Sequence, residues 1–433
     1  MSKERNLQMK HMVMAAGLAA LMMGPAGADA ATVDKKALLT TYSDIAHATY
    51  EDSLISARQL KTAIDRFLAA PAEATLKAAR EAWLAARVPY QQSEAFRFGN
   101  PSVDAWEGKV NAWPLDEGLI DYVNADSYGS ESGENPLYTA NVIANKRLKV
   151  AGKTVNATKI TKKLLSETLH EAGKVEANVA TGYHAIEFLL WGQDLNGTGP
   201  GAGNRPYTDY DLKHCTNKNC DRRAAYLKTV TELLVDDLQS MVAEWSPKGK
   251  TRRQLLAGNP DAGISRIVTG LGSLSYGELA GERMKLGLML HDPEEEHDCF
   301  SDNTHNSHYY DVKGIQNVYL GRYSRIDGKT VTGPSLSALV AAKDPAMDTE
   351  MKAKLDATMA AMTVLVDTAK GGEAYDQMIG ADNKAGNAKV QAAIDALVAQ
   401  TRTLEKVVAG LNLTDIKFEG SASLDDPSKV KKK

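Results

Sequence analysis

Residues 54–68 read LISARQLKTAIDRFL, and their apolar side chains recur at helical spacing. Leu54, Ala57, Leu60, Ile64 and Leu68 are three or four residues apart, which places them on one face of an α-helix. Such a stripe is typical of a helix that packs one side against a core. The stretch therefore predicts a packed helix and not a strand, in which apolar residues would alternate.

The same periodicity returns later in the chain. It recurs in Leu227, Val230, Leu234 and Leu238, and again in Val390, Ile394, Leu397, Leu404 and Val407. Gly, Pro and Asn gather between such stretches, at 99–101, 124–136, 196–206 and 246–263, where helices are expected to end. Alternating β-branched residues are scarce, so the fold class expected is all-α.

The length of 433 residues exceeds what one hydrophobic core usually holds, which predicts two domains. A faint internal similarity links Glu94-Ala95-Phe96-Arg97 with the segment from Glu278 to Arg283. Such Glu and Arg pairs also arise by chance, so they do not establish duplication by themselves. The boundaries expected are a signal peptide over 1–30, helical bundles over 31–245 and 246–420, and a flexible tail over 421–433.

The first 30 residues have the pattern of a secretory signal. Basic residues precede an apolar run from about Met12 to Met23, and Ala28-Asp29-Ala30 has the small-x-small form of a cleavage site. The apolar run is shorter than the roughly 20 residues that a membrane-spanning helix needs. We therefore expect export with cleavage after Ala30, and a retained anchor is the alternative.

Charge and cysteine usage fit an exported protein. The net charge of −4 gives no sign of nucleic-acid binding. Cys215 and Cys220 lie close together in a polar segment, which in an oxidising compartment predicts a local disulfide. Cys299 is left over, either as a free thiol or as a member of a polar cluster described below.

The segment Gly182-Tyr183-His184-Ala185-Ile186-Glu187 is the first candidate for chemistry. Its composition is helical, so the spacing of three places His184 and Glu187 on one face, where both can reach a common ion or proton. Gly182 lies about one turn away and leaves room for a close approach. The alternative is a buried histidine paired with a glutamate that only stabilises helix packing.

Residues 291–311 form a second candidate site. They contain His291, His297, His305 and His308 together with seven acidic residues, including Asp298 and Asp302. Imidazole with carboxylate suits first-row transition metals such as iron or zinc. A helix would bring His305 and His308 together, because they are three residues apart. The alternative is a solvated acidic loop, which fits residues 294–296 better than residues 301–308.

A third stretch, residues 91–118, interleaves charged and aromatic side chains and has the composition of a pocket wall or of a loop with aromatic anchors. Its most specific parts are residues 92–99 (QSEAFRFG) and residues 113–118 (WPLDEG). Together with residues 182–191, 278–284 and 300–310, these stretches resemble the imelysin family, and most closely its iron-regulated branch. The family pattern Gly-x-His-x-x-Glu falls on Gly182, His184 and Glu187.

The resemblance implies two related helical bundles with a site at their interface. It implies a bacterial protein in the periplasm or at the outer membrane or cell surface, linked to iron acquisition, with other iron-uptake components as partners. The expected cofactor is a divalent metal ion, iron before zinc, and its expected ligands are His184, Glu187, His305, His308 and Asp302. The residues expected to line the pocket or orient the ligands are Gly182, Glu94, Arg97, Asp116, Glu278, Glu282 and Arg283.

Founding members of that family were called insulin-cleaving membrane proteases, which raises the alternative of a metallopeptidase. The sequence contains no His-Glu-x-x-His string, and Phe188 occupies the place where the inverted His-x-x-Glu-His form needs histidine. Catalytic residues are therefore not assigned. A module that binds an organic ligand or a protein without metal is the third hypothesis.

Overall fold

The computed structural model describes residues 33–430, so the expected signal peptide over residues 1–30 lies outside the described residues. Within this part of the chain helices dominate, and strands occur only as two short antiparallel pairs. The prediction of an all-α fold is confirmed. Among the helices of residues 33–430, none is both long and apolar enough to cross a membrane.

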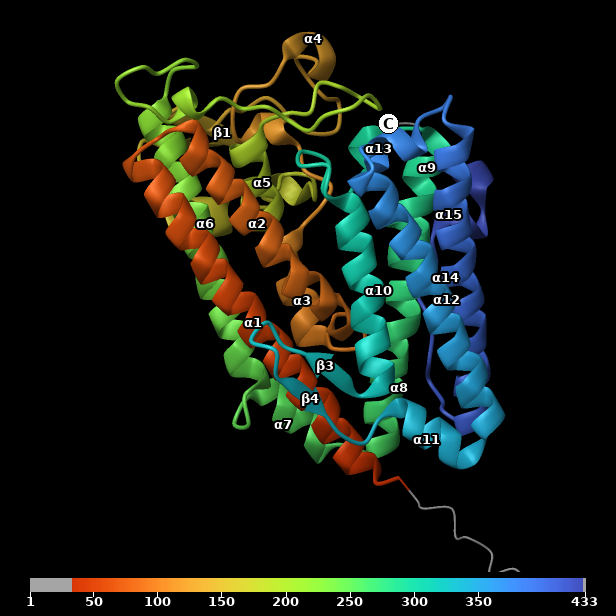
Figure 1. Ribbon diagram of the computed structural model, residues 1–433. Helices are drawn as coiled ribbons and strands as arrows, with labels where there is room; N and C mark the ends of the chain where they lie inside the picture. Colours follow the sequence, from red (N-terminus) through yellow and green to blue (C-terminus); the bar gives the residue numbers. More distant parts are fainter. Residues whose placement is uncertain (1–32, 431–433) are drawn as a thin grey trace, which may run out of the picture. The chain divides into compact units, whose positions relative to one another are not determined.

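Three long helices pack side by side in the first half of the chain. Helix α1 (Lys35–Ala69) lies along α2 (Glu73–Ser93) and α6 (Cys220–Trp245) (Figure 1). Leu60 and Ile64 of the stripe on α1 are fully buried there. The shorter helix α5 (Gly182–Trp191) contacts α2, α6 and α3 (Pro101–Asn111). Every residue of α5 is buried, so this helix lies in the interior.

A second group of helices follows in the chain. It contains α10 (Thr304–Leu320), α12 (Pro345–Lys370) and α14 (Lys384–Leu411). A continuous helix formed by α8 (Pro260–Ser273), η6 (Leu274–Lys285) and α9 (Leu286–Leu290) packs against α14, and its η6 part is a π-helix. Extended π-helical segments are rare and are often found at functional sites.

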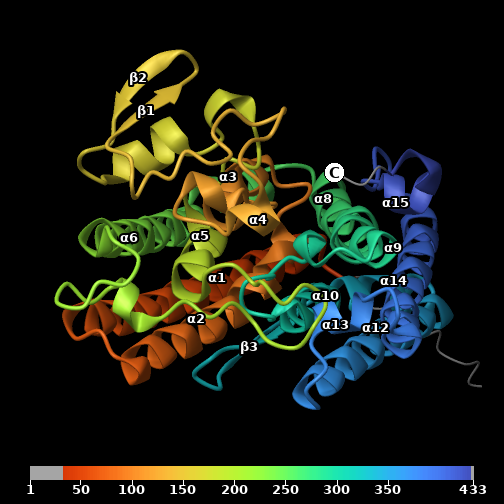
Figure 2. The same cartoon turned by 90° about the horizontal axis from the view of Figure 1, so that it is seen from above.

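Helix α10 joins the two groups, because it packs on α2 as well as on α12. Figure 2 shows α10 between α1 and α2 on one side and α12 and α14 on the other. Gly314 of α10 lies so close to the backbone of Gln92 that a Cβ atom would collide with it. A glycine is therefore needed for this approach of the two helices.

Shorter elements connect the long helices. They are η1 (Glu94–Phe96), η2 (Glu117–Leu119), α4 (Ala125–Tyr128), β1 (Arg147–Val150), β2 (Lys153–Asn156), η3 (Leu164–Leu169), η4 (Ala172–Lys174), η5 (Tyr207–Asp209), α7 (Lys250–Ala257), η7 (Pro293–Glu295), β3 (Arg322–Ser324), β4 (Thr330–Thr332), α11 (Leu336–Lys343), α13 (Tyr375–Ile379), α15 (Ala422–Asp425) and η8 (Pro427–Lys429). In the segment that begins at residue 421, Ser423 is buried and its Oγ donates to the Gly281 carbonyl over 2.9 Å.

The β3–β4 hairpin packs on the first helix. Asp52 of α1 is 1% exposed, and its carboxylate accepts hydrogen bonds from Tyr323 Oη, from the Arg325 guanidinium and from the Ile326 N–H. Three donors from one hairpin therefore satisfy a buried charge, as burial requires. The hairpin turns at Asp327 and Gly328, and the glycine has a φ of +83°.

Candidate functional site

Helix α5 carries the first two site residues. His184 Nδ1 lies 3.1 Å from Glu187 Oε2, and both side chains are almost completely buried. The spacing of three residues produces this contact along one helical face. The helix begins at Gly182 with a φ of +84°, and a Cβ atom there would lie 2.5 Å from the Val110 carbonyl oxygen. This glycine therefore allows α5 to lie directly against the end of α3.

His297 and Asp298 complete the site from the irregular segment between η7 and α10. The ligand atoms of His184, His297 and Asp298 all lie within 4.8 Å of one another, and all three residues are buried. The two imidazole rings meet edge to face, with centroids 4.8 Å apart. This is the one group of three such donors that converges within residues 33–430.

Arg87 of α2 fixes the carboxylate of this group. Its Nη2 donates to Asp298 Oδ1 over 2.7 Å, and its Nη1 donates to Asn111 Oδ1 over 2.6 Å. Asn303 and Ser307 also donate to Asp298 Oδ2. Because these donors come from α2 and from the beginning of α10, Asp298 is held in one orientation.

Glu187 is held by the same segment that supplies His297. Its Oε1 accepts hydrogen bonds from the backbone N–H of Ser301 at 3.0 Å and from the Ser301 hydroxyl at 2.7 Å. The other oxygen faces His184, so the carboxyl group bridges α5 and the segment before α10. The position of the His184 ring is thereby tied to both elements.

Electrostatics keep both histidines of the group neutral. Burial and the neighbouring Arg87 lower the pKa of His184 to about 3, and burial together with Arg283 lowers the pKa of His297 well below its usual value. Arg87 and Gln91 both direct N–H groups at His297 Nδ1 from 3.4 Å, so this nitrogen is an acceptor. Within the described residues His184 Nε2 is buried without a hydrogen-bond partner.

The two carboxyl groups differ in their protonation. Burial raises the pKa of Glu187 well above its usual value, and the nearby charge of Asp298 adds to this effect. Burial also acts to raise the pKa of Asp298, but the charge of Arg87 and the hydrogen bonds from Ser307 and Asn303 together outweigh it, and the pKa of Asp298 is lowered. Asp298 is therefore the permanent negative charge of the site.

His305, His308 and Asp302 lie near this group but outside it. His308 is fully buried with both ring nitrogens unpartnered among the described residues, and its ring meets Tyr375 edge to face at 4.9 Å. His305 is partly buried, and its Nδ1 has no partner in the same part of the chain. Asp302 lies close enough to Asp376 that the charge of Asp376 raises its pKa.

A buried ionic network contains most of the residues expected to orient the ligands. Arg283 of η6 donates to Glu94 Oε2 over 2.8 Å and to Asp311 Oδ2 over 3.0 Å, and Glu278 lies between Arg283 and Arg97. The network joins η1, η6 and α10, and the charge of Arg283 contributes to the lowered pKa of His297 and His308. Glu94, Arg97, Glu278 and Arg283 are thus brought together.

Two of the residues expected at the pocket lie outside this network. Glu282 is exposed, whereas the adjacent Arg283 is buried. Asp116 is partly buried and accepts a hydrogen bond from Asn135. Adjacent residues of a helix lie on different faces, so Glu282 and Arg283 have different surroundings although they are neighbours in the chain.

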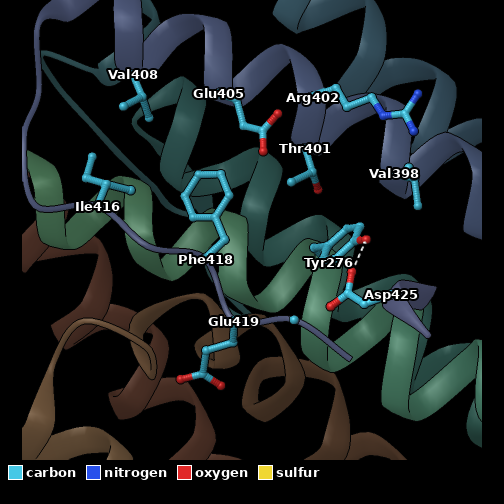
Figure 3. Close-up of a pocket in the computed structure, with 11 residues that line it drawn as sticks. Tyr276, Val398, Thr401, Arg402, Glu405, Val408, Ile416, Phe418, Glu419 and Asp425 are labelled. Carbon is cyan, nitrogen blue, oxygen red and sulfur yellow. Dashed lines mark hydrogen bonds between the residues drawn. The ribbon is translucent and has the colours of Figure 1, made fainter. Parts of the chain in front are cut away.

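A small cavity adjoins the group at Arg87. It has a volume of about 250 Å³ and is lined by residues that include Arg87, Gln91, Asn303, Asn306 and Ser307. Arg87 and Ser307, which line this cavity, also contact Asp298, so the cavity reaches the neighbourhood of the buried donors. A larger cavity of about 440 Å³ lies elsewhere, between η6, α14 and the segment around Phe418, and none of the three donors lines it (Figure 3).

A disulfide joins Cys215 and Cys220 at the start of α6, the pair that the sequence singles out. Cys299 is a free thiol next to Asp298 in the chain. Burial raises the pKa of this thiol well above its usual value, and nearby Glu294 and Glu187 add to the shift. Cys299 is therefore a protonated thiol and not a thiolate.

Comparisons with known proteins identify one family and two similar proteins. The sequence pattern of the imelysin family matches residues 46–404, a range that contains the whole site. Iron-regulated protein A of Synechococcus elongatus is 37% identical over 68 residues, which are 16% of this chain and 19% of that protein. A solved structure described as an iron-regulated protein A precursor of Parabacteroides distasonis has a similar fold, with a TM-score of 0.63 at 21% identity over 89% of this chain and 97% of that one.

Proposed function

Since the chain belongs to the imelysin family, we propose that it binds a metal ion at His184, His297 and Asp298 and takes part in iron handling at the bacterial cell envelope. The convergence of two imidazoles and one carboxylate in the interior is the observation that carries the proposal. Such a set of nitrogen and oxygen donors suits iron, and also zinc.

His184 fits this role, whereas His297 Nδ1 would have to exchange the N–H groups of Arg87 and Gln91 for the ion. The unpartnered Nε2 of His184 has a lone pair to offer when Nδ1–H donates to Glu187 Oε2. Glu187 would then fix the tautomer and the ring orientation, as carboxylates beside metal-bound histidines commonly do. A bound cation would also offset the repulsion between Glu187 and Asp298, which share this interior site.

The role in iron handling is supported by the names of the similar proteins, both of which are called iron-regulated. The signal pattern of residues 1–30 supports export, and the protein would act in the periplasm or at the outer membrane or cell surface with other iron-uptake components. His308 and His305 are further ligand candidates, because each has a buried ring nitrogen without a partner among the described residues. Asp302 lies with Asp376 instead.

Calorimetric titration with Fe²⁺ and with Zn²⁺ tests the site. Wild type is expected to bind one of these ions stoichiometrically, and His184→Ala and His297→Ala are expected to lose that binding. His47→Ala is the matched control, because His47 lies on α1 outside the group and is expected to leave binding unchanged. Binding by His184→Ala that equals wild type would refute the proposal, provided that circular dichroism shows both proteins folded.

A further inference from the structure

Six carboxyl groups gather near the segment that supplies His297 and Asp298. Glu117, Asp194, Glu294, Glu296 and Asp376 line one cavity together with Pro293, Cys299 and Phe300. Asp302 interacts electrostatically with Asp376 and Asp194 and belongs to the same set. We call these six residues the acidic pocket. They come from η2, from the loop after α5, from the segment around η7 and from α13.

No basic side chain neutralises the acidic pocket. Within residues 33–430 none of the six carboxyl groups has a Lys, Arg or His nitrogen within 4.0 Å, whereas the neighbouring Asp298 is paired with Arg87. Burial and the charges of the other members raise the pKa of Glu117 to about 8 and of Asp302 to about 8. Without a positive charge beside them these carboxyl groups therefore keep their protons near neutral pH, and a bound cation would allow them to ionise.

Two members of the pocket are buried with nothing to bind. Glu296 is 1% exposed and Asp376 is 2% exposed, and no oxygen of either side chain makes a hydrogen bond of normal length and angle within the described residues. The Thr304 hydroxyl and the Gln377 N–H lie close enough only to moderate the raised pKa of each group. Buried polar atoms are nearly always satisfied, so four unpartnered oxygens facing one cavity need an explanation. A bound ion would supply it.

Size and donor type restrict the ligand. The cavity has a volume of about 10 Å³, room for a single water-sized particle and too little for an organic molecule. Glu294 is exposed and Asp194 is partly buried, whereas Glu117, Glu296 and Asp376 are buried, so the carboxyl groups lead from the surface inward. The protonated thiol of Cys299 offers no thiolate, which leaves oxygen ligands.

We propose that the acidic pocket binds a hard cation of the Ca²⁺ type through oxygen ligands, at a site distinct from the His184 group. Oxygen-only coordination with several carboxylates is the chemistry that such cations prefer. Only the His184 group has three donors within 4.8 Å of one another in residues 33–430. Because the carboxylate oxygens of the acidic pocket lie farther apart than this, their side chains would rotate toward a bound ion. Water molecules would occupy the coordination positions that the carboxylates leave open.

Terbium luminescence tests this site independently of the His184 group. Tb³⁺ is a hard cation with oxygen preference, and light absorbed by Tyr375, which adjoins Asp376 in the chain, would excite a bound ion. Wild type is expected to give saturable Tb³⁺ emission. The double variant Glu296→Gln and Asp376→Asn keeps the side-chain shapes and is expected to bind Tb³⁺ at least tenfold more weakly.

The matched control is Glu131→Gln with Glu134→Gln, two exposed residues of the α4–β1 connection, which is expected to bind Tb³⁺ like wild type. His184→Ala is also expected to keep Tb³⁺ binding, so a failure of the metal site at His184 leaves this result unaffected. Glu294→Gln alters only an exposed side chain and is expected to weaken Tb³⁺ binding several-fold without loss of folding. Equal Tb³⁺ affinity of wild type, the double variant and Glu294→Gln would overturn the proposal.

Discussion

Arg87 and Asp298 form an ion pair in the interior, with Arg87 Nη2 2.7 Å from Asp298 Oδ1 and neither side chain more than 2% exposed. The pair joins α2 to the segment before α10, elements that are about half the chain apart in sequence. Arg87 also keeps Asp298 charged beside His184 and His297. The same contact therefore stabilises the fold and sets the charge of the candidate metal site.

Replacing Asp298 with Asn would leave Arg87 buried with an uncompensated charge. The expected loss of stability is about 3–5 kcal/mol, the range for breaking a buried pair from one side. Urea denaturation measures it. Asp104→Asn is the control, because Asp104 pairs with Arg97 while its side chain is 52% exposed, and the expected cost there is below about 1 kcal/mol. Equal costs for both variants would contradict the structural role of the interior pair.

Gly182→Ala is expected to destabilise the protein, because the new Cβ would collide with the Val110 carbonyl and the φ of +84° disfavours alanine. Gly410→Ala is the matched control, and the opposite change in stability is expected for it. Gly410 is exposed near the end of α14 with nothing within 4 Å of a new Cβ, so alanine should stabilise by up to about 1 kcal/mol. Thermal melting of both variants checks that the melting temperature falls for Gly182→Ala and rises for Gly410→Ala. A Gly182→Ala variant as stable as wild type would show that α3 and α5 are not in close contact.

Glu107 predicts a pH dependence of stability. Burial raises its pKa from 4.5 to about 7, although Arg97 opposes the shift. The folded state therefore holds the proton more tightly than the unfolded state, and the resulting stability is complete below pH 4.5 and is lost as the pH rises through 7. Each pKa unit corresponds to about 1.4 kcal/mol, so the loss is at most on the order of 3 kcal/mol.

Glu107→Gln cannot titrate and is expected to flatten this decline in urea midpoints measured between pH 4.5 and 7. Asn111 donates to Glu107 Oε1, and the glutamine amide oxygen can accept the same bond. The control is Glu131→Gln on the surface, which should leave the pH profile unchanged. A Glu107→Gln profile with the slope of wild type would exclude Glu107 as the group responsible.

Loss of the Cys215–Cys220 disulfide is expected to have a local effect. The closed loop is short, so the stabilisation should lie below the roughly 3 kcal/mol of a 15-residue loop. The double variant Cys215→Ser and Cys220→Ser should melt slightly below wild type and keep its helical circular dichroism. Alkylation of the unreduced, denatured wild type should label Cys299 alone, and labelling of all three cysteines would show that the bridge is absent.

The helices could be predicted from sequence, because each packed helix carries its own apolar stripe. Helix α5 and the contact of His184 with Glu187 also follow from local spacing. Helical spacing favoured His305 and His308 as metal ligands beside His184. Spacing along one helix, however, does not show which residues of another element lie next to that helix. His297 and Asp298 reach His184 from an irregular segment whose path depends on Arg87, far away in sequence.

The β3–β4 hairpin was missed for a different reason. Its strands are three residues each, too short for alternation to stand out, although Asp327-Gly328 is a strong hairpin signal. Its position against α1 depends on Asp52, whose need for partners is visible only once the residue is known to be buried. The local sequence thus predicts the turn of the hairpin but not the helix on which the hairpin packs.

The contact of Asp52 with this hairpin also has a consequence for the order in which the polypeptide is made. Asp52 is synthesised 271 residues before Tyr323, the first of its three donors. Before the β3–β4 hairpin has left the ribosome, every residue of α1 is already present. The Asp52 carboxylate, which the finished protein buries, still lacks its three donors. The first helix therefore completes its packing late in synthesis, and a nascent chain that ends before Arg322 presents an unfinished surface to chaperones and proteases.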